Sequence, residues 1–306
     1  MAFTAADVKN LREMTGVGMM DCKKALAEAD GNMDKAVEIL REKGLAASQK
    51  KAGRIAAEGM AYAAVIDGIG VVVEVHAETD FVAKNEKFVD FVKGVAATVA
   101  ANKPADLDAL MECKYADTEM TVTQQQQEMV LVIGENIKVR RFAFYTEGVS
   151  VPYIHAGGKI GVLVNLETDL TAEQVNEAGK DAAMQIAALN PRFWDKSEVT
   201  QEVLDEEKKI MLAQMANDPK MANKPDQVKE KVVAGKLNKF YAENCLLQQD
   251  FVKDGEVTVE KYLANVAKAL GGTITFKTAV RFEKGEGIEK KQENFAEEIA
   301  KQLAGN

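Results

Sequence analysis

Two stretches of this chain repeat the same order of elements, and the repeat limits the folds open to it. Each begins with an apolar segment of strand character, passes through a Thr-Asp-apolar turn and an amphipathic helical stretch, and stops at a proline. A second β-rich segment belongs to each copy. The pieces are 69–75, 79–81, Pro104 and 137–145 in the first copy, and 160–166, 168–170, Pro191 and 273–282 in the second. The repeat predicts two related α+β subdomains, with a chance likeness of two strand–helix units as the alternative.

A small helical head precedes the repeat. Thr4 is a favourable N-cap, and apolar residues at helical spacing predict short helices over 5–14, 20–29 and 33–42, separated by glycine turns. This pattern resembles the ubiquitin-associated fold. Residues 45–54 carry three basic groups and no acid, and we interpret them as a tether between the head and the body, with a solvated linker as the alternative.

A long polar insertion interrupts the second copy. Helical spacing of apolar residues in 197–217 and 226–243 predicts two antiparallel helices that form a projecting hairpin. Its narrow apolar stripe must pack on itself, on the body or on a second protomer, so a homodimer through the hairpin is one open arrangement. The tail is predicted to form an amphipathic helix with three apolar residues on one face, Phe295, Ile299 and Leu303.

These patterns predict an α+β protein with a three-helix head, a core of two related subdomains, a helical hairpin and a C-terminal helix. The expected bounds are 1–54 for the head and linker, 55–146 for the first core subdomain, 147–195 and 245–282 for the two parts of the second, 196–244 for the hairpin and 283–306 for the C-terminal module.

Charge and cysteine content narrow the function classes. The chain has 306 residues and a net charge of −9, which is the wrong overall sign for a nucleic-acid binder. Its cysteines, Cys22, Cys113 and Cys245, are far apart and show no metal-ligand spacing, so reduced thiols are expected, with no metal site. Without a signal sequence or an apolar run of about 18 residues, we expect a soluble cytoplasmic protein.

The sequence offers little for catalysis. Its only histidines are His76, which lies in a predicted strand, and His155, and no triad order or metalloprotease motif accompanies them. The glycines do not form a phosphate loop, so we expect neither a cofactor nor direct nucleotide binding. An enzyme that uses His155 or Cys22 is the least favoured interpretation.

Apolar residues at turns are the better candidates for function. Met19 and Met20 follow a glycine turn, and flexible methionines suit adaptable protein contacts, although both also suit the small core of the head. Either Thr79 or Asp80 can cap the helix that follows, and Phe81 then sits at its start. The pattern alone favours a core position for Phe81, with an outward knob as the alternative. Its counterpart Leu170 is expected in the core.

Five motifs, in order, resemble those of the bacterial elongation factor Ts family. Together they span most of the chain and are far more specific than any single one of them. They are Leu11 to Leu26 with its Thr-Gly-x-Gly-Met-Met turn, Glu78 to Asn85, Ile133 to Ile137 with Arg140-Arg141, Tyr153 to His155 leading into Lys159 to Leu163, and Arg281-Phe282 with Gly285 to Lys290. Ala156 departs from the glycine common in the family, and the Gln124 to Gln127 run has no evident counterpart.

The resemblance implies a guanine-nucleotide exchange factor that binds elongation factor Tu, destabilises its magnesium and GDP binding, and promotes GDP release without covalent chemistry of its own. It implies that Asp80 and Phe81 promote exchange, with Phe81 wedging between helices near the magnesium site of the partner. The remaining implied contact residues are Arg12, Met19, Met20 and Lys23 in the head, Thr79 and Val82 beside the wedge, and Ile133, Gly134 and His155 on the core. A non-catalytic scaffold that binds proteins through the ubiquitin-associated-like head is the alternative.

Overall fold

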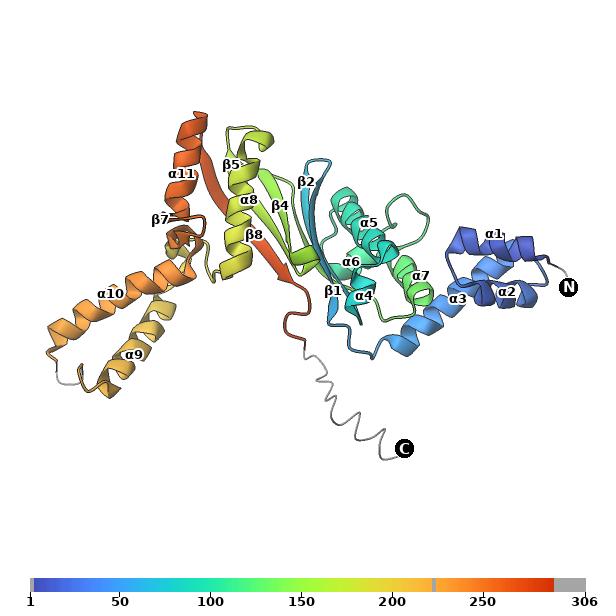
Figure 1. The fold of residues 1–306 in the computed structure, drawn as a ribbon, viewed down its shortest axis with the longest axis horizontal. Helices are drawn as coiled ribbons and strands as arrows, with labels where there is room; N and C mark the ends of the chain where they lie inside the picture. Colours follow the sequence, from blue (N-terminus) through green and yellow to red (C-terminus); the bar gives the residue numbers. More distant parts are fainter. Residues whose placement is uncertain (1–2, 222–223, 289–306) are drawn as a thin grey trace.

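The computed structural model describes residues 3–221 and 224–288, and the chain in it is an elongated α+β molecule (Figure 1). A helical head lies at one end, a helical hairpin projects from the other, and two three-stranded sheets with their helices lie between them. The fold class expected from the sequence is therefore confirmed. The amphipathic helix expected in the tail, with Phe295, Ile299 and Leu303, lies outside the described residues.

The head consists of α1 (Ala5–Thr15), α2 (Met19–Glu28) and α3 (Met33–Lys51). The Thr4 side chain caps α1 as expected, and Asp7 completes a capping box. Helix α3 is longer than predicted, so most of the expected tether is helical. The physical reason is tertiary: Gly44 lies against the backbone of α7 (Val122–Ile133), and Ala47 packs against the core of the first subdomain.

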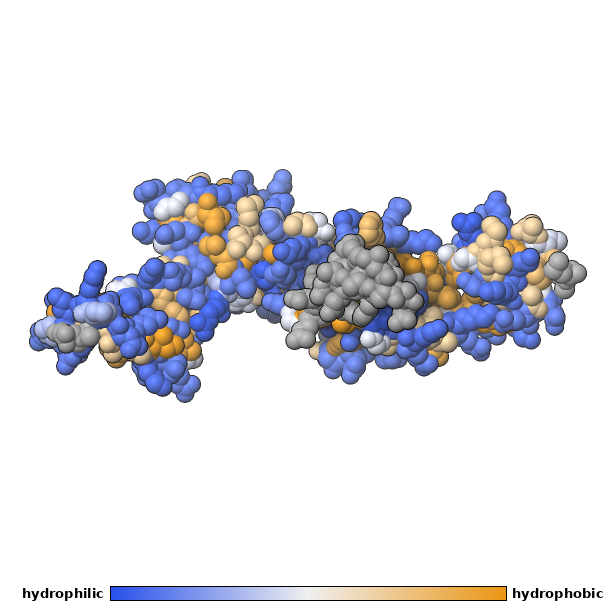
Figure 2. Space-filling view, turned by 60° about the horizontal axis from the view of Figure 1, so that its bottom comes forward, coloured by the Kyte–Doolittle hydropathy of each residue, from blue (hydrophilic) through white to orange (hydrophobic). Residues whose placement is uncertain are grey.

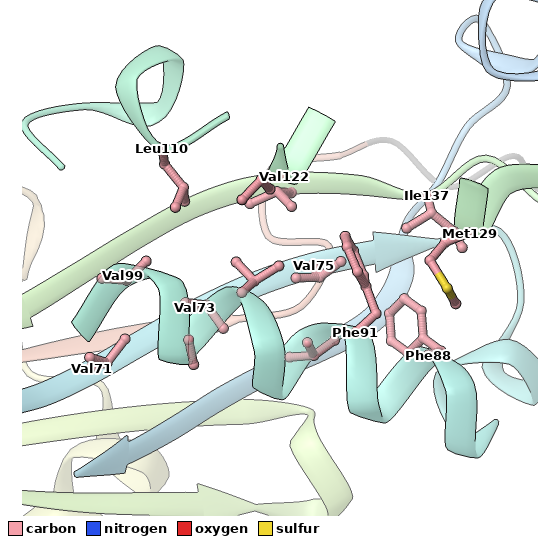
Figure 3. Close-up of a cluster of buried hydrophobic side chains, with 14 of the residues drawn as sticks. Val71, Val73, Val75, Phe88, Phe91, Val99, Leu110, Val122, Met129 and Ile137 are labelled. Carbon is pink, nitrogen blue, oxygen red and sulfur yellow. The ribbon is translucent and has the colours of Figure 1, made fainter. Parts of the chain in front are cut away.

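The first subdomain is built on a sheet with strand order β1-β2-β3. Its strands are β1 (Glu58–Ile66), β2 (Ile69–Ala77) and β3 (Lys138–Tyr145), all antiparallel. Its helices are α4 (Asp80–Ala83), α5 (Glu86–Asn102), α6 (Leu107–Glu112) and α7. Alternate residues of β2, Val71, Val73 and Val75, face α5 and pack against Phe88 and Phe91 (Figure 3).

The second subdomain repeats this arrangement with strand order β4-β5-β8. Its elements are β4 (Val149–His155), β5 (Ile160–Thr168), α8 (Ala172–Leu189), β6 (Asp250–Phe251), β7 (Asp254–Thr258), α11 (Val259–Leu270) and β8 (Ile274–Glu283), with short 3-10 segments at Ala156–Gly158, Lys196–Glu198 and Leu246–Gln248. The central strands β2 and β5 carry a register shift at equivalent positions, after Glu74 and after Asn165. This shared irregularity supports the internal repeat.

The two sheets pack on each other through small and apolar side chains. Ala61 and Ala63 of β1 and Val72 of β2 meet Leu163 and Phe282 of the second sheet. Helices cover the outer faces, so the core has helix–sheet–sheet–helix layers (Figure 1). Because the side chains of a strand alternate, one face of each sheet packs on its helices and the other on its sister sheet.

The hairpin consists of α9 (Gln201–Asn217) and α10 (Asp226–Asn244). Met211, Met215, Val233 and Phe240 form most of its own small core, so its apolar stripe packs on itself. No helix of the described residues is long and apolar enough to cross a membrane.

Candidate functional site

The most exposed large apolar side chain among the described residues is Phe81, with 83% of its surface accessible. It stands on α4, a helix of four residues capped by Thr79, whose hydroxyl accepts a hydrogen bond from the Val82 backbone N–H at 3.4 Å. Val82 and Ala83 turn inward, and Val82 packs against the first core. The core position that the pattern alone favours for Phe81 is therefore wrong, because so short a helix buries only one side.

The loop that follows α7 lies against this exposed turn. The carboxylate of Glu135 accepts hydrogen bonds from the Thr79 backbone N–H and hydroxyl at 3.0 and 2.7 Å. Ile133 packs against the first core, and Gly134 is an exposed C-cap in the left-handed conformation (φ 89°) that favours glycine. The structure thus brings the 78–81 and 133–136 motifs together, although they are far apart in the sequence.

The head presents a second group of exposed side chains. Arg12, Met19, Met20 and Lys23 are all exposed, and Met19 and Met20 are more than half accessible. The two methionines therefore do not fill the small core of the head, which is one of the two roles their pattern allows.

The head is attached to the first subdomain near the start of α5. Leu131 and Val132 of α7 pack against the head core, and the Lys87 ammonium donates to the Gly16 carbonyl at 3.2 Å. This contact places the turn that precedes Met19 beside the first turn of α5, shortly after the helix that carries Phe81. Figure 2 shows patches of apolar surface on the head at one end of the molecule and on the hairpin at the other, with hydrophilic surface around them.

His155 lies at the end of β4 and is exposed. Its Nδ1 is 3.0 Å from the Tyr153 hydroxyl. The turn after β4 brings Gly158 against Met60, and Met60 pairs with Val75 near the end of β2. His155 therefore lies at the end of the double sheet where β2 leads into α4.

Neither residue proposed for an enzymatic role is activated. The Cys22 thiol is buried and donates to the Val17 carbonyl at 3.5 Å, and burial raises its pKa, which disfavours the nucleophilic thiolate. His155 has Tyr153 as its polar partner and no carboxylate to orient it in the described part of the chain. Within residues 3–221 and 224–288, no group of three or more His, Cys, Asp or Glu side chains is placed to hold a metal ion.

His76 has a structural place. It is 2% exposed, and its Nε2 is 2.6 Å from an oxygen of the fully buried Glu74. Arg140 and Arg141 pair with the same carboxylate, and Arg141 also pairs with Glu286 beyond β8. This charge network ties the first sheet to the segment that follows the second.

Comparison with known proteins identifies relatives of this chain. The profile of the family described as "Elongation factor TS" matches residues 78–286. The chain is 48% identical to elongation factor Ts of Syntrophotalea carbinolica over 303 residues, covering 98% of this chain and 99% of that protein. It is 49% identical to elongation factor Ts of Clostridioides difficile over 303 residues, covering 98% of each chain.

The chain belongs to the elongation factor Ts family. The resemblance drawn from the five motifs is therefore confirmed.

In this elongation factor Ts family member, the sequence had pointed to the exposed turn and missed what holds it. Glu135 and Glu78 belong to two separate motifs that lie 57 residues apart in the chain. Nothing in the local pattern of either motif indicates that one carboxylate contacts the other turn.

Proposed function

We propose that this chain is a guanine-nucleotide exchange factor that binds elongation factor Tu and promotes GDP release during translation elongation. Family membership supports the role. Exchange requires no covalent chemistry from the factor, so the chain is not proposed to be an enzyme or to bind nucleotide itself. A role in translation would place it in the cytoplasm.

Exchange follows from a difference in affinity. A GTPase holds GDP through backbone amides, a lysine and a magnesium ion that neutralises phosphate charge. A factor that binds the nucleotide-free form more tightly weakens GDP binding by the same factor, because the coupling between two ligands is reciprocal. Weakening GDP binding about a thousandfold needs roughly 4 kcal/mol of preferential binding.

The exposed Phe81 is the observation that carries the proposal. A phenylalanine that is 83% accessible on a capped and anchored turn has no role in the stability of its own chain. Burying such a side chain in a partner contributes about 1.5–3 kcal/mol. Phe81 would therefore supply a large part of the required preference. Asp80 beside it pairs with the exposed Lys84 at 3.0 Å and, within residues 3–221 and 224–288, with no other basic side chain, so it would be free to exchange partners.

The remaining preference must come from a wider contact. We propose that Arg12, Met19, Met20 and Lys23 dock the head on the GTPase, and that Thr79, Val82, Ile133, Gly134 and His155 line the core side of the interface. Val82 and Ile133 are partly buried, so their contribution would come mainly through the shape of the surface that they support.

Stopped-flow release of fluorescent GDP from elongation factor Tu tests the proposal. Phe81→Ala should slow the maximal release rate roughly 10- to 150-fold, the equivalent of the burial energy above, while the pair still binds. Leu189→Ala is the matched control, since Leu189 is also an exposed apolar residue (49%) but lies at the end of α8. Equal release rates for Phe81→Ala and wild type would remove Phe81 from the mechanism.

The rival interpretation, a protein-binding scaffold, predicts a different binding pattern. Calorimetry with nucleotide-free and GDP-bound elongation factor Tu separates the two: an exchange factor binds the nucleotide-free form more tightly, whereas a scaffold binds both alike. Equal affinities would refute the exchange function.

A further inference from the structure

The carboxylate of Glu135 accepts hydrogen bonds from the turn that leads into α4, the helix that carries Phe81. Oε2 of Glu135 accepts hydrogen bonds from the backbone N–H groups of Glu78 and Thr79, both at 3.0 Å, and Oε1 accepts from the Thr79 hydroxyl at 2.7 Å. Hydrogen bonds to an ionised acceptor are stronger than neutral ones. All of these donors lie within the two residues that precede α4.

The Thr79 hydroxyl links this carboxylate to the helix. The hydroxyl donates to Glu135 and accepts from the Val82 backbone N–H. Glu135 therefore fixes the direction of the O–H bond, which leaves an oxygen lone pair free to cap α4. A helix of four residues cannot stand by itself, because nucleation costs more than one turn of hydrogen bonds returns. The orientation of α4, and with it that of Phe81, therefore depends on the anchored cap.

A reciprocal contact closes the arrangement. Oε1 of Glu78 accepts from the Asn136 backbone N–H at 2.6 Å, and the Asn136 side chain donates to the Arg54 carbonyl at 2.8 Å. Arg54 in turn pairs with Glu78 at 3.5 Å. The turn before α4, the loop after α7 and the segment that leaves the head are thus joined by side chains of residues 78, 135 and 136.

We propose that Glu135 is a positioning residue for exchange: it acts through Thr79 to hold Phe81 in the orientation that enters the partner. The proposal rests on the exchange function proposed above. Glu135 is itself half-buried behind the turn, and both of its carboxylate oxygens accept hydrogen bonds from Glu78 or Thr79. Its effect would therefore appear in the rate at which bound complex releases GDP, and not in how tightly the factor binds the GDP-bound form of the partner.

A double-mutant cycle of Glu135→Ala and Phe81→Ala tests this mechanism. Glu135→Ala should lower the maximal GDP release rate about tenfold, the loss expected when a functional group is displaced by a fraction of an ångström. The concentration of factor that gives half-maximal release should stay unchanged within about twofold. The double variant should release GDP no more slowly than Phe81→Ala alone, because a loosened turn has no effect once the ring is gone. Multiplicative slowing in the double variant would show that Glu135 acts independently and would overturn the proposal.

A control variant, a second measurement and a replacement variant accompany the cycle. Glu119→Ala removes a carboxylate that is 89% exposed from the same subdomain and should leave release unchanged. Hydrogen exchange should show faster exchange in peptides covering 78–85 of Glu135→Ala, with the sheet residues unaffected. If Glu135→Ala does not fold, Glu135→Gln, which keeps the shape and loses the charge, takes its place in the cycle.

The exchange role of Phe81 and the positioning role of Glu135 can be refuted separately. Unchanged release for Phe81→Ala would refute the exchange role of the turn and the positioning role together. Slow release for Phe81→Ala with wild-type release for Glu135→Ala would refute the positioning role alone.

Discussion

The two subdomains carry the same Thr-Asp-apolar turn after their central strand, but they use it in opposite ways. In the first, Thr79-Asp80-Phe81 opens a separate four-residue helix and leaves Phe81 in solvent. In the second, Asp169 accepts from the Thr273 backbone and hydroxyl at 2.6 and 3.0 Å, and Leu170 packs in the second core. The second turn is therefore held by contacts within its own subdomain, and Thr171 caps α8 directly. A single motif is structural in one copy and exposed to solvent in the other.

The same contrast holds within the central strands. Glu74 of β2 and Asn165 of β5 occupy equivalent positions at the register shift, and both face the sister sheet. Glu74 pairs with two arginines and His76, whereas Asn165 donates to the Glu147 carbonyl at 2.7 Å. The first copy thus relies on buried charge where the second uses a neutral hydrogen bond.

The largest effect on stability is expected from breaking this charged network. Glu74→Gln leaves Arg140 and Arg141 without their shared carboxylate and should lower the free energy of unfolding by about 3 kcal/mol. Asn165→Ala, at the equivalent position, removes neutral hydrogen bonds and should cost only about 1–2 kcal/mol. Chemical denaturation of both variants measures the difference, and equal losses would show that the two positions are energetically alike.

The second-largest effect is expected in the pH dependence of stability, which the ionisable Glu74 of β2 should show and the neutral Asn165 of β5 should not. Burial acts to raise the pKa of Glu74, but hydrogen bonds from His76 and Arg141 and the charge of Arg141 outweigh it, so this pKa lies below its ordinary value of 4.5. A depressed carboxyl pKa contributes stability above the unfolded pKa that is lost as pH falls through the folded one. The gap in stability between wild type and Glu74→Gln should therefore narrow as pH falls below about 4.5. A gap that stays constant down to the acid transition would contradict the ionised state of Glu74.

The two apolar residues of the repeated turn should separate stability from exchange. Leu170→Ala should lower the free energy of unfolding by about 2 kcal/mol, since the side chain packs in the second core, and should leave GDP release unchanged. Phe81→Ala should change stability by less than about 0.5 kcal/mol, because the ring is exposed. Thermal unfolding of both variants, measured alongside the release assay, tests this. A lower stability for Phe81→Ala than for Leu170→Ala would contradict the assignment of Leu170 to the core and of Phe81 to the surface.

The smallest effect is expected at the two aspartates. Asp80→Ala should slow GDP release about 3- to 10-fold, the size of one hydrogen bond to the partner, and should leave the melting temperature unchanged. Asp169→Ala should lower the melting temperature, because it removes the acceptor of the Thr273 donors that depress the pKa of Asp169, and should leave release unchanged. Identical behaviour of the two variants in both assays would remove the functional distinction between the copies.

Strong periodicity made most elements predictable, and its absence hid two strands. Helices α1, α3, α5, α8 and α9 begin at residues whose side chains cap them, as the sequence indicates. Helices α2 and α10 begin without a side-chain cap. Strand β1 is rich in alanine, which has low strand propensity, and becomes a strand because Ala61 and Ala63 let the two sheets approach closely. Strand β4 contains Pro152, which is tolerated because β4 lies at the edge of its sheet.

By itself the sequence determined the repeat, the fold class, the turn motifs and the family, because these follow from local spacing and residue type. Only the tertiary structure decided which copy of the turn is open. Whether Phe81 enters a core or solvent depends on which surfaces surround α4, and whether the turn holds its shape depends on Glu135, which arrives from a distant loop. Burial and long-range hydrogen bonding are properties of packing, and a local pattern of residues does not contain them.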